Sequence, residues 1–114
     1  MFQGKIEVSR SGQKTDGYQM NQTLLLSPRA GISARPQLEI YADDVKCSHG
    51  ATVGELDPDQ LFYLRSRGVP EAAARAILIR AFLAESLDPI SCAPARAWME
   101  SLVESTAIVA EMAP

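Results

Sequence analysis

Hydrophobic and polar positions follow two different periods along this chain, and the change lies near residue 56. Before it, short segments rich in β-branched, aromatic or leucine residues alternate with residues typical of turns. The segments that we expect to form strands are GKIEV (4–8), TLLLS (23–27), QLEIYA (37–42) and DVKCSHGATVG (44–54). Between them we expect turns in SGQKTDGYQ, at Asp16-Gly17, and in SPRAG and SARPQ. The first half is therefore predicted to be mainly β.

Two arrangements are open for these strands. Antiparallel hairpins are the usual choice for closely spaced strands, but tight alternation does not flank Asp16-Gly17 on both sides. The alternative is a parallel β-helix whose strands are successive rungs, roughly fifteen to twenty residues apart, each stacking on the last. The spacing does not decide between the two. In both, outer strands expose edges that need a covering partner.

From ELDPDQLFYLRSRG onward the hydrophobic period is that of an α-helix. Asp57 suits the N-cap, and Pro58 suits the first turn because its missing N–H would be unpaired there. Gly68 can adopt the left-handed conformation that ends a helix. The clearest boundary in the sequence therefore precedes a helix that starts at about residue 58.

Two further helices are predicted after this one. Pro70 precedes EAAARAILIRAFLAESL (71–87), and Asp88-Pro89 ends it because a residue before proline avoids the α region. Its expected apolar face consists of Ala74, Ile77, Leu78, Ala81 and Phe82. The last helix is predicted from about Pro94 to Met112, with Trp98, Leu102 and Val109 buried. We thus expect a β part in residues 1–56 and a helical subdomain in residues 57–114.

Composition narrows the class of protein. With 114 residues the chain can bury one modest core, and its net charge of -3, without a basic block beside aromatics, argues against nucleic-acid binding. The most apolar stretch is interrupted by Arg75 and Arg80, and MFQGKIEVSR lacks the apolar core of a signal peptide, so we expect a cytoplasmic protein without a membrane span. Cys47 and Cys92 are then free thiols or ligands rather than a disulfide.

The only histidine, His49, lies two positions after Cys47. On a strand these residues point to the same face, so they could supply two metal ligands, or a thiolate and its base. A structural zinc-type site needs four ligands and a catalytic one three, and the chain has no other histidine. A complete site within one copy is therefore not expected, and a half-buried strand pair is the alternative. Asp43 and Asp44 could add oxygen ligands, although turn residues of this type are more often solvated.

The helix at DPDQLFYLRSRG carries a second candidate site. Phe62 and Tyr63 are adjacent and therefore point about 100° apart, so both cannot face one core. With Arg65 and Arg67 nearby, they form a set of residue types that is enriched at protein interfaces. The alternative is that one aromatic belongs to the core, the other lies at its rim, and the arginines cover the surface or the helix end. No phosphate loop, nucleophile elbow or His-Glu-x-x-His motif is present, so an enzyme is not indicated.

Together, DDVKCSHGATVG and LFYLRSRG resemble the SufB/SufD scaffold family of the SUF iron–sulfur cluster assembly system, within a similarity from about Gln13 to Leu87. The Lys-Cys-Ser-His-Gly-Ala-Thr form is most like the C-terminal part of the SufD branch. The resemblance implies the terminal rungs of a right-handed parallel β-helix followed by a small C-terminal helical subdomain. It also implies a chain that is a fragment or a truncated relative of longer proteins.

For function, the resemblance implies a non-enzymatic scaffold that pairs with a SufB-like subunit and docks a SufC-like ABC ATPase. His49, with Cys47 beside it, would lie at the SufB-facing interface, the remaining ligands coming from the partner chain. An iron–sulfur cluster would be held transiently in the full complex and not stably by this fragment. Leu61, Phe62, Tyr63, Arg65 and Arg67 would fall in or beside the ATPase-docking part.

Three further expectations concern self-association and alternative functions. A β-helix cut between rungs exposes unpaired backbone groups, so the chain should self-associate, for example as a homodimer. A stand-alone thiol or metal-dependent enzyme using Cys47 and His49 is one alternative function. A purely structural oligomerisation domain is the other.

Overall fold

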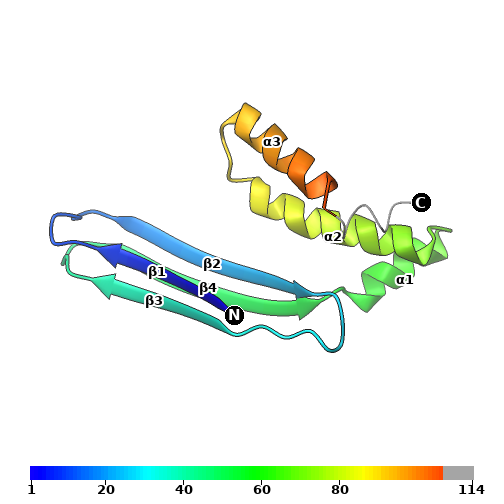
Figure 1. The fold of residues 1–114 in the computed structure, drawn as a ribbon, viewed down its shortest axis with the longest axis horizontal. Helices are drawn as coiled ribbons and strands as arrows, with labels where there is room; N and C mark the ends of the chain where they lie inside the picture. Colours follow the sequence, from blue (N-terminus) through cyan, green and yellow to red (C-terminus); the bar gives the residue numbers. More distant parts are fainter. Residues whose placement is uncertain (107–114) are drawn as a thin grey trace. The chain divides into compact units, whose positions relative to one another are not determined.

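The computed structural model describes residues 1–106, which form two units, one ending at Glu55 and the other beginning at Leu56 (Figure 1). The first unit contains four strands: β1 (Phe2–Val8), β2 (Asp16–Leu25), β3 (Ala34–Ile40) and β4 (Lys46–Glu55). The second contains three helices: α1 (Pro58–Ser66), α2 (Glu71–Leu87) and α3 (Ala93–Glu104). The predicted order of β structure followed by α structure is confirmed.

All strand pairing is parallel. β1 pairs with β3 from Phe2 opposite Ala34 to Val8 opposite Ile40, and β2 pairs with β4 from Asp16 opposite Lys46 to Leu25 opposite Glu55. The strands of one sheet run opposite to those of the other, as their arrows show in Figure 1. Antiparallel hairpins are therefore wrong. The alternative in which each strand stacks on the preceding strand is also wrong, because β1 pairs with β3 and β2 pairs with β4.

The connection between β1 and β2 also differs from the prediction. Asp16-Gly17 begins β2 instead of forming a turn, because the backbone ladder to β4 already starts there. The chain reverses earlier, where Gly12 N donates to Ser9 O at 2.9 Å and Lys14 takes a left-handed φ of 68°. Gln13 and Lys14 then bond to Asp44, which ties this turn to the corresponding turn before β4.

Alternate residues of β1, β2 and β3 are half-buried on the face where the two sheets meet. Val8 and Ala42 are the most buried residues of this unit. Contacts between the sheets are close: a Cβ placed on Gly4 of β1 would lie 1.6 Å from Nε2 of Gln19 on β2. The core of the β unit is therefore a single thin layer of small and medium side chains.

Local signals set the limits of α1 and α2. Oδ1 of Asp57 accepts hydrogen bonds from the N–H of Asp59 at 2.8 Å and of Gln60 at 3.4 Å, which confirms the predicted N-cap. Gly68 has φ of 86° just after α1, where a left-handed residue ends a helix. The span of α2 matches the prediction, but its buried residues are Ala74, Ala76, Ile79 and Leu87. Ile77 and Ala81 are exposed, so the predicted apolar face is only partly right.

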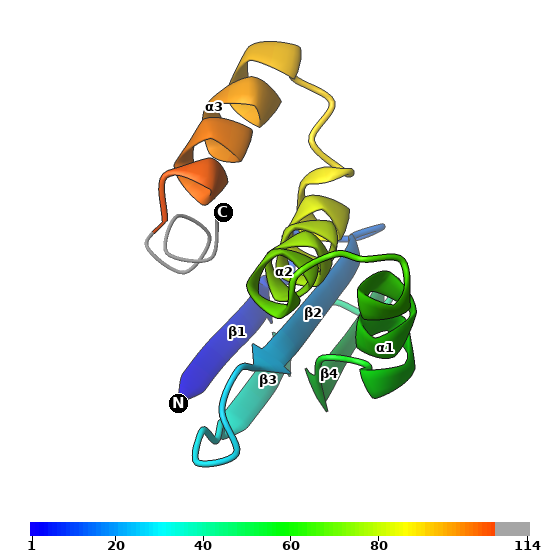
Figure 2. The ribbon, with the colours of Figure 1, turned by 90° about the vertical axis from the view of Figure 1, so that its right-hand side faces the viewer.

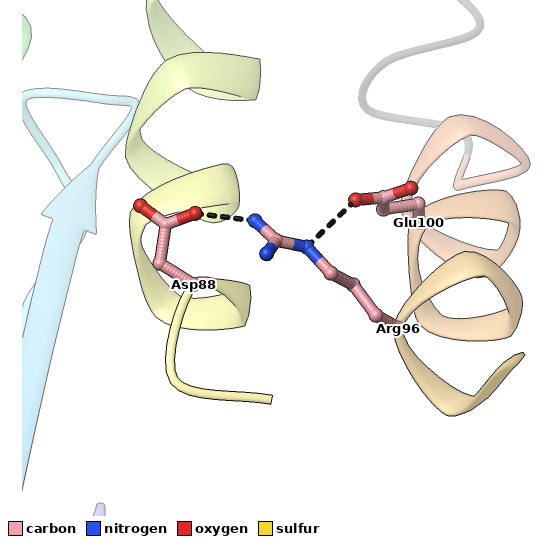
Figure 3. Close-up of polar contacts among 3 residues, drawn as sticks. All are labelled: Asp88, Arg96 and Glu100. Carbon is pink, nitrogen blue, oxygen red and sulfur yellow. Dashed lines mark hydrogen bonds and ion pairs between the residues drawn. The ribbon is translucent and has the colours of Figure 1, made fainter. Parts of the chain in front are cut away.

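α2 and α3 are consecutive helices of the second unit (Figure 2), and α3 packs on α2 through a different face from the one expected. Trp98 is 63% exposed and Leu102 is 42% exposed, so their predicted burial is wrong, and Val109 lies outside the described residues. The half-buried residues of α3 are Arg96, Met99 and Val103. Figure 3 shows one contact between the two helices: the Arg96 guanidinium reaches Asp88 at the end of α2 and bonds through Nε to Glu100 at 3.2 Å. Trp98 is two positions after Arg96, about 200° around the helix, and so points away from α2.

In residues 1–106, no helix has both the length and the apolar character that a bilayer span requires.

Candidate functional site

Cys47 and His49 both lie on β4, whose partner strand is β2. The parallel register places Cys47 opposite Gly17 and His49 opposite Gln19. Because side chains alternate between the two faces of a strand, these four residues share one face. It is the face that meets the other sheet, since a Cβ on Gly17 would lie 3.8 Å from Cγ2 of Ile6 on β1. The Cys47/His49 pair therefore belongs to the interior face of the β unit, at its β4 side.

Cys47 is half-buried there as a free thiol. Its Sγ lies 3.5 Å from the position that a Cβ on Gly17 would take, so the thiol packs over that glycine at ordinary contact distance. His49 is exposed, although it lies on the same face.

The described residues contain no group of three or more His, Cys, Asp or Glu side chains that could hold a metal ion. Asp44, one of the two candidate oxygen donors, lies in the turn before β4 and forms an ion pair with Lys14 at 2.5 Å. The second cysteine, Cys92, is the N-cap residue of α3 in the other unit. Within the described part of this chain, Cys47 and His49 thus offer two ligands and no third beside them.

The free edge of β4 differs in character from that of β3. Between Lys46 and Glu55 the strand has no charged residue and no proline. β3, in contrast, carries Arg35, Pro36 and Glu39. Charges and proline on an edge strand discourage pairing with another chain, whereas a long uncharged edge permits it. Of these two edges, β4 is therefore the one suited to accept an additional strand, and it carries Cys47 and His49.

The predicted interface residues of α1 form an exposed aromatic surface. Phe62 is 73% exposed and Tyr63 is 56% exposed, so neither aromatic is a core residue. The Arg67 guanidinium lies 5.1 Å from the centre of the Tyr63 ring, within the range of a cation–π contact. Arg65 forms an ion pair with Glu71 at 3.4 Å. Leu61 is half-buried and anchors the helix instead of extending the surface.

A shallow apolar groove of about 430 Å³ runs beside this surface, between α1 and α2. Its lining residues are Asp59, Gln60, Tyr63, Leu64, Ile77 and Leu78. Tyr63 therefore belongs both to the groove and to the cation–π pair. Ile77 and Leu78 belong to the predicted apolar face of α2, and here they line the groove instead of being fully buried. We call Phe62, Tyr63, Arg67 and the groove the α1 surface.

Sequence reasoning missed the groove and the neighbours of Cys47 and His49 on β2. Gly17 and Gln19 come to lie beside them only through pairing with a strand 30 positions away. The one local signal is the alternation of Tyr18 and Met20 with polar residues, which is typical of a strand, whereas the preceding Asp16-Gly17 pair favours a turn.

Comparison with known proteins identifies the family. The family model described as "SUF system FeS cluster assembly, SufBD core domain" matches residues 1–82. The chain belongs to the SufBD family. The match includes all four strands, α1 and most of α2, so both candidate surfaces lie within the SufBD core, while α3 lies beyond it. The predicted resemblance is confirmed, and it begins at residue 1 instead of near Gln13.

Individual relatives place the chain near the SufD branch of the SufBD family. It is 54% identical over 85 residues to the iron-sulfur cluster assembly protein SufD of Escherichia coli, covering 75% of this chain and 20% of the relative. It is 50% identical over 93 residues to a SufBD family protein of Synechocystis, covering 82% of this chain and 20% of that protein. SufD of Bacillus subtilis is 35% identical over 104 residues, which cover 91% of this chain and 24% of the relative. The chain thus spans about a fifth to a quarter of these relatives.

Proposed function

We propose that this chain is the C-terminal part of a SufD-like scaffold subunit, which supports iron–sulfur cluster assembly without catalysing a reaction of its own. The observation that carries the proposal is the SufBD core match over residues 1–82, with 54% identity to a SufD protein over 85 residues. The functional residues are carried by two surfaces of the chain, the β4 edge and the α1 surface.

The four strands are then the last rungs of a right-handed parallel β-helix in residues 1–56, and residues 57–114 are its helical subdomain. Two features of the fold support this. Each strand pairs in parallel with the next strand but one, so one complete rung contains two strands and about thirty residues. The thin core, with few fully buried residues, is what a terminal piece of a longer stack would have.

A SufB-like subunit is the proposed partner of the β4 edge. The uncharged backbone between Lys46 and Glu55 can accept a strand from another chain, which is a common mode of protein recognition. His49 and Cys47 lie on this strand, and the remaining ligands for a nascent cluster would come from the partner. The cluster is cargo of the complex in this scheme, held transiently between two chains.

A SufC-like ABC ATPase is the proposed partner of the α1 surface. Phe62, Tyr63, Arg65 and Arg67 supply the aromatic and arginine side chains that are enriched at protein interfaces, and the half-buried Leu61 holds the helix beside them. The apolar groove beside Tyr63 offers a pocket for a side chain of the ATPase.

The proposal is tested by cluster assembly on the whole SufD-like protein, with its SufB-like and SufC-like partners, carrying His49→Ala. We expect assembled iron and sulfide to fall at least tenfold while the complex still forms. Ser48→Ala is the matched control, because Ser48 is adjacent but points to the opposite face of β4. Assembly by the His49→Ala complex at the level of the Ser48→Ala control would contradict the role given to His49.

A further inference from the structure

The side chain of Gln19 occupies the centre of the interior face, directly opposite His49 in the parallel register. Its Oε1 is buried and has no hydrogen-bond partner within residues 1–106. A buried acceptor without a donor costs the folded state roughly 1–3 kcal/mol. Buried acceptors are nearly always hydrogen-bonded, so we expect a neighbouring side chain to donate a hydrogen bond to this oxygen.

Gly4 determines where the Gln19 amide lies. A Cβ at residue 4 would lie 1.6 Å from Nε2 and 2.8 Å from Cδ of Gln19, so the amide occupies space that any other residue at this position would fill. The amide is therefore held across the interior, against β1, while its backbone belongs to β2. A polar group fixed in this way is well suited to orient a neighbour.

Three side chains near Gln19 on this face can donate a hydrogen bond. Asn21 accepts a hydrogen bond from Oγ1 of Thr23 at 3.1 Å on its Oδ1 and keeps its amide donors, but it lies two positions along β2, roughly 6.6 Å from Gln19. Cys47 packs over Gly17, one step away diagonally, and a thiol is a weak donor. His49 is the direct neighbour. Parallel strands lie about 4.8 Å apart, and stacked polar side chains at that spacing form ladders along the sheet.

We propose that Gln19 is a positioning residue for His49, with Oε1 accepting a hydrogen bond from an imidazole N–H. A neutral imidazole has one N–H donor and one nitrogen lone pair, and the bond made by the first selects the tautomer. Gln19 thereby leaves the other ring nitrogen as a free acceptor or ligand, on a side chain that is exposed. The structure does not itself pair the two side chains; the inference rests on the unpartnered Oε1, on the register of β2 and β4, and on Gly4. Its importance for cluster assembly rests on the function proposed above.

The single histidine makes a direct test practical. The nitrogen-15 shifts of the His49 ring are measured in this chain at about pH 8.5, where an ordinary imidazole is neutral. We expect one tautomer to dominate. Gln19→Leu should reduce the ratio of the two tautomers about fivefold, which is the equivalent of one ordinary hydrogen bond. Gln22→Leu is the control, because Gln22 also lies on β2 but points to the other face.

A second variant keeps the amide and moves it. Gly4→Ala places a methyl group where Nε2 lies, and the flexible glutamine end must shift away. It should change the tautomer ratio in the same direction as Gln19→Leu, whereas Gly31→Ala should not, since nothing lies within 4 Å of the added Cβ there. Circular dichroism shows that each variant is folded. A ratio within twofold of the parent in both Gln19→Leu and Gly4→Ala would overturn the proposal.

Assays of cluster assembly distinguish a failure of this inference from a failure of the proposed function. In the whole complex, Gln19→Leu should lower assembly severalfold, and should lower it no further when His49→Ala is already present. If His49→Ala has no effect on assembly while Gln19→Leu still changes the tautomer ratio, the contact holds and the proposed function fails. Equal further loss from Gln19→Leu in the His49→Ala background would show that Gln19 acts independently of His49, which would overturn the positioning role.

Discussion

Replacing Phe62 with alanine should separate docking from folding. The side chain is 73% exposed, so its loss should change the free energy of unfolding by no more than about 0.5 kcal/mol. Its burial in an interface would contribute much more to the free energy of binding. A phenylalanine buries roughly 200 Å², and the exposed share of Phe62 corresponds to about 150 Å², worth at most about 4 kcal/mol. Interface hot spots lose about 2 kcal/mol or more on truncation. Phe62→Ala is therefore expected to weaken the free energy of binding by about 2 to 4 kcal/mol.

The assay is calorimetric titration of a SufC-like ATPase from the same organism into this chain, with thermal unfolding followed by circular dichroism. Phe62→Ala should raise the dissociation constant at least about 30-fold, the equivalent of 2 kcal/mol. The unfolding midpoint should stay within about 3 °C of the parent. Arg67→Ala, which removes the cation–π contact to Tyr63, should weaken binding less, because such contacts contribute about 0.5–1 kcal/mol at exposed sites.

Trp98→Ala is the matched control for Phe62→Ala. Trp98 is also a large exposed aromatic residue, at 63%, but it lies on α3, beyond the SufBD core match. It should leave the dissociation constant within about twofold if the α1 surface is the docking site. Binding that Phe62→Ala leaves within threefold of the parent would refute the docking role of α1. An equal loss in both variants would indicate nonspecific adhesion of exposed aromatics.

Three further predictions concern the stability and association of the chain. Asp57→Ala should cost about 1 kcal/mol by removing the cap of α1, and thermal unfolding should show a midpoint lower by roughly 4–8 °C; Asp59→Asn, which keeps the cap, should shift it little. Light scattering should show self-association of the chain through the uncharged β4 edge, which Thr52→Lys should suppress; a parent chain that is already a monodisperse monomer would contradict this. Hydrogen bonds and charge attraction from Glu39, and then Glu7, raise the pKa of Lys5 above its ordinary value of 10.5. The ion pairs therefore add stability below pH 10.5 and lose it as the pH rises through the raised folded-state pKa. The deficit of Lys5→Met in urea unfolding should accordingly shrink as the pH rises above 10.5; a deficit that stays constant there would argue against the ion pairs as its source.

Interactions close in the sequence are the ones that sequence reasoning captured. The limits of α2 and the capping of α1 depend on residues within four positions of each other, such as Asp57 and Gln60 or the residues around Asp88-Pro89. The shared face of Cys47 and His49 follows from the two-residue period of a strand. The family signature in residues 43–54 and 61–68 likewise depends on contiguous residues.

Strand pairing was beyond such reasoning because it is not local. Phe2 pairs with Ala34 and Asp16 with Lys46, and nothing within either segment specifies a partner some thirty residues away. The spacing of the strands therefore could not distinguish hairpins from parallel stacking. For the same reason Gln19 could not be recognised as the neighbour of His49, nor Gly4 as the residue that makes room for its amide.

The sequence by itself determined the number and order of the described strands and helices and the residues that mark the family, because capping and periodicity act within a few positions. The tertiary structure decided which faces those elements bury. α3 has two candidate stripes, one with Trp98 and Leu102 and one with Met99 and Val103, and only its packing on α2 buries the second, beside the ion pair of Arg96 with Asp88. Likewise, only the pairing of β2 with β4 brings Gln19 beside His49. Such choices depend on contacts between distant segments.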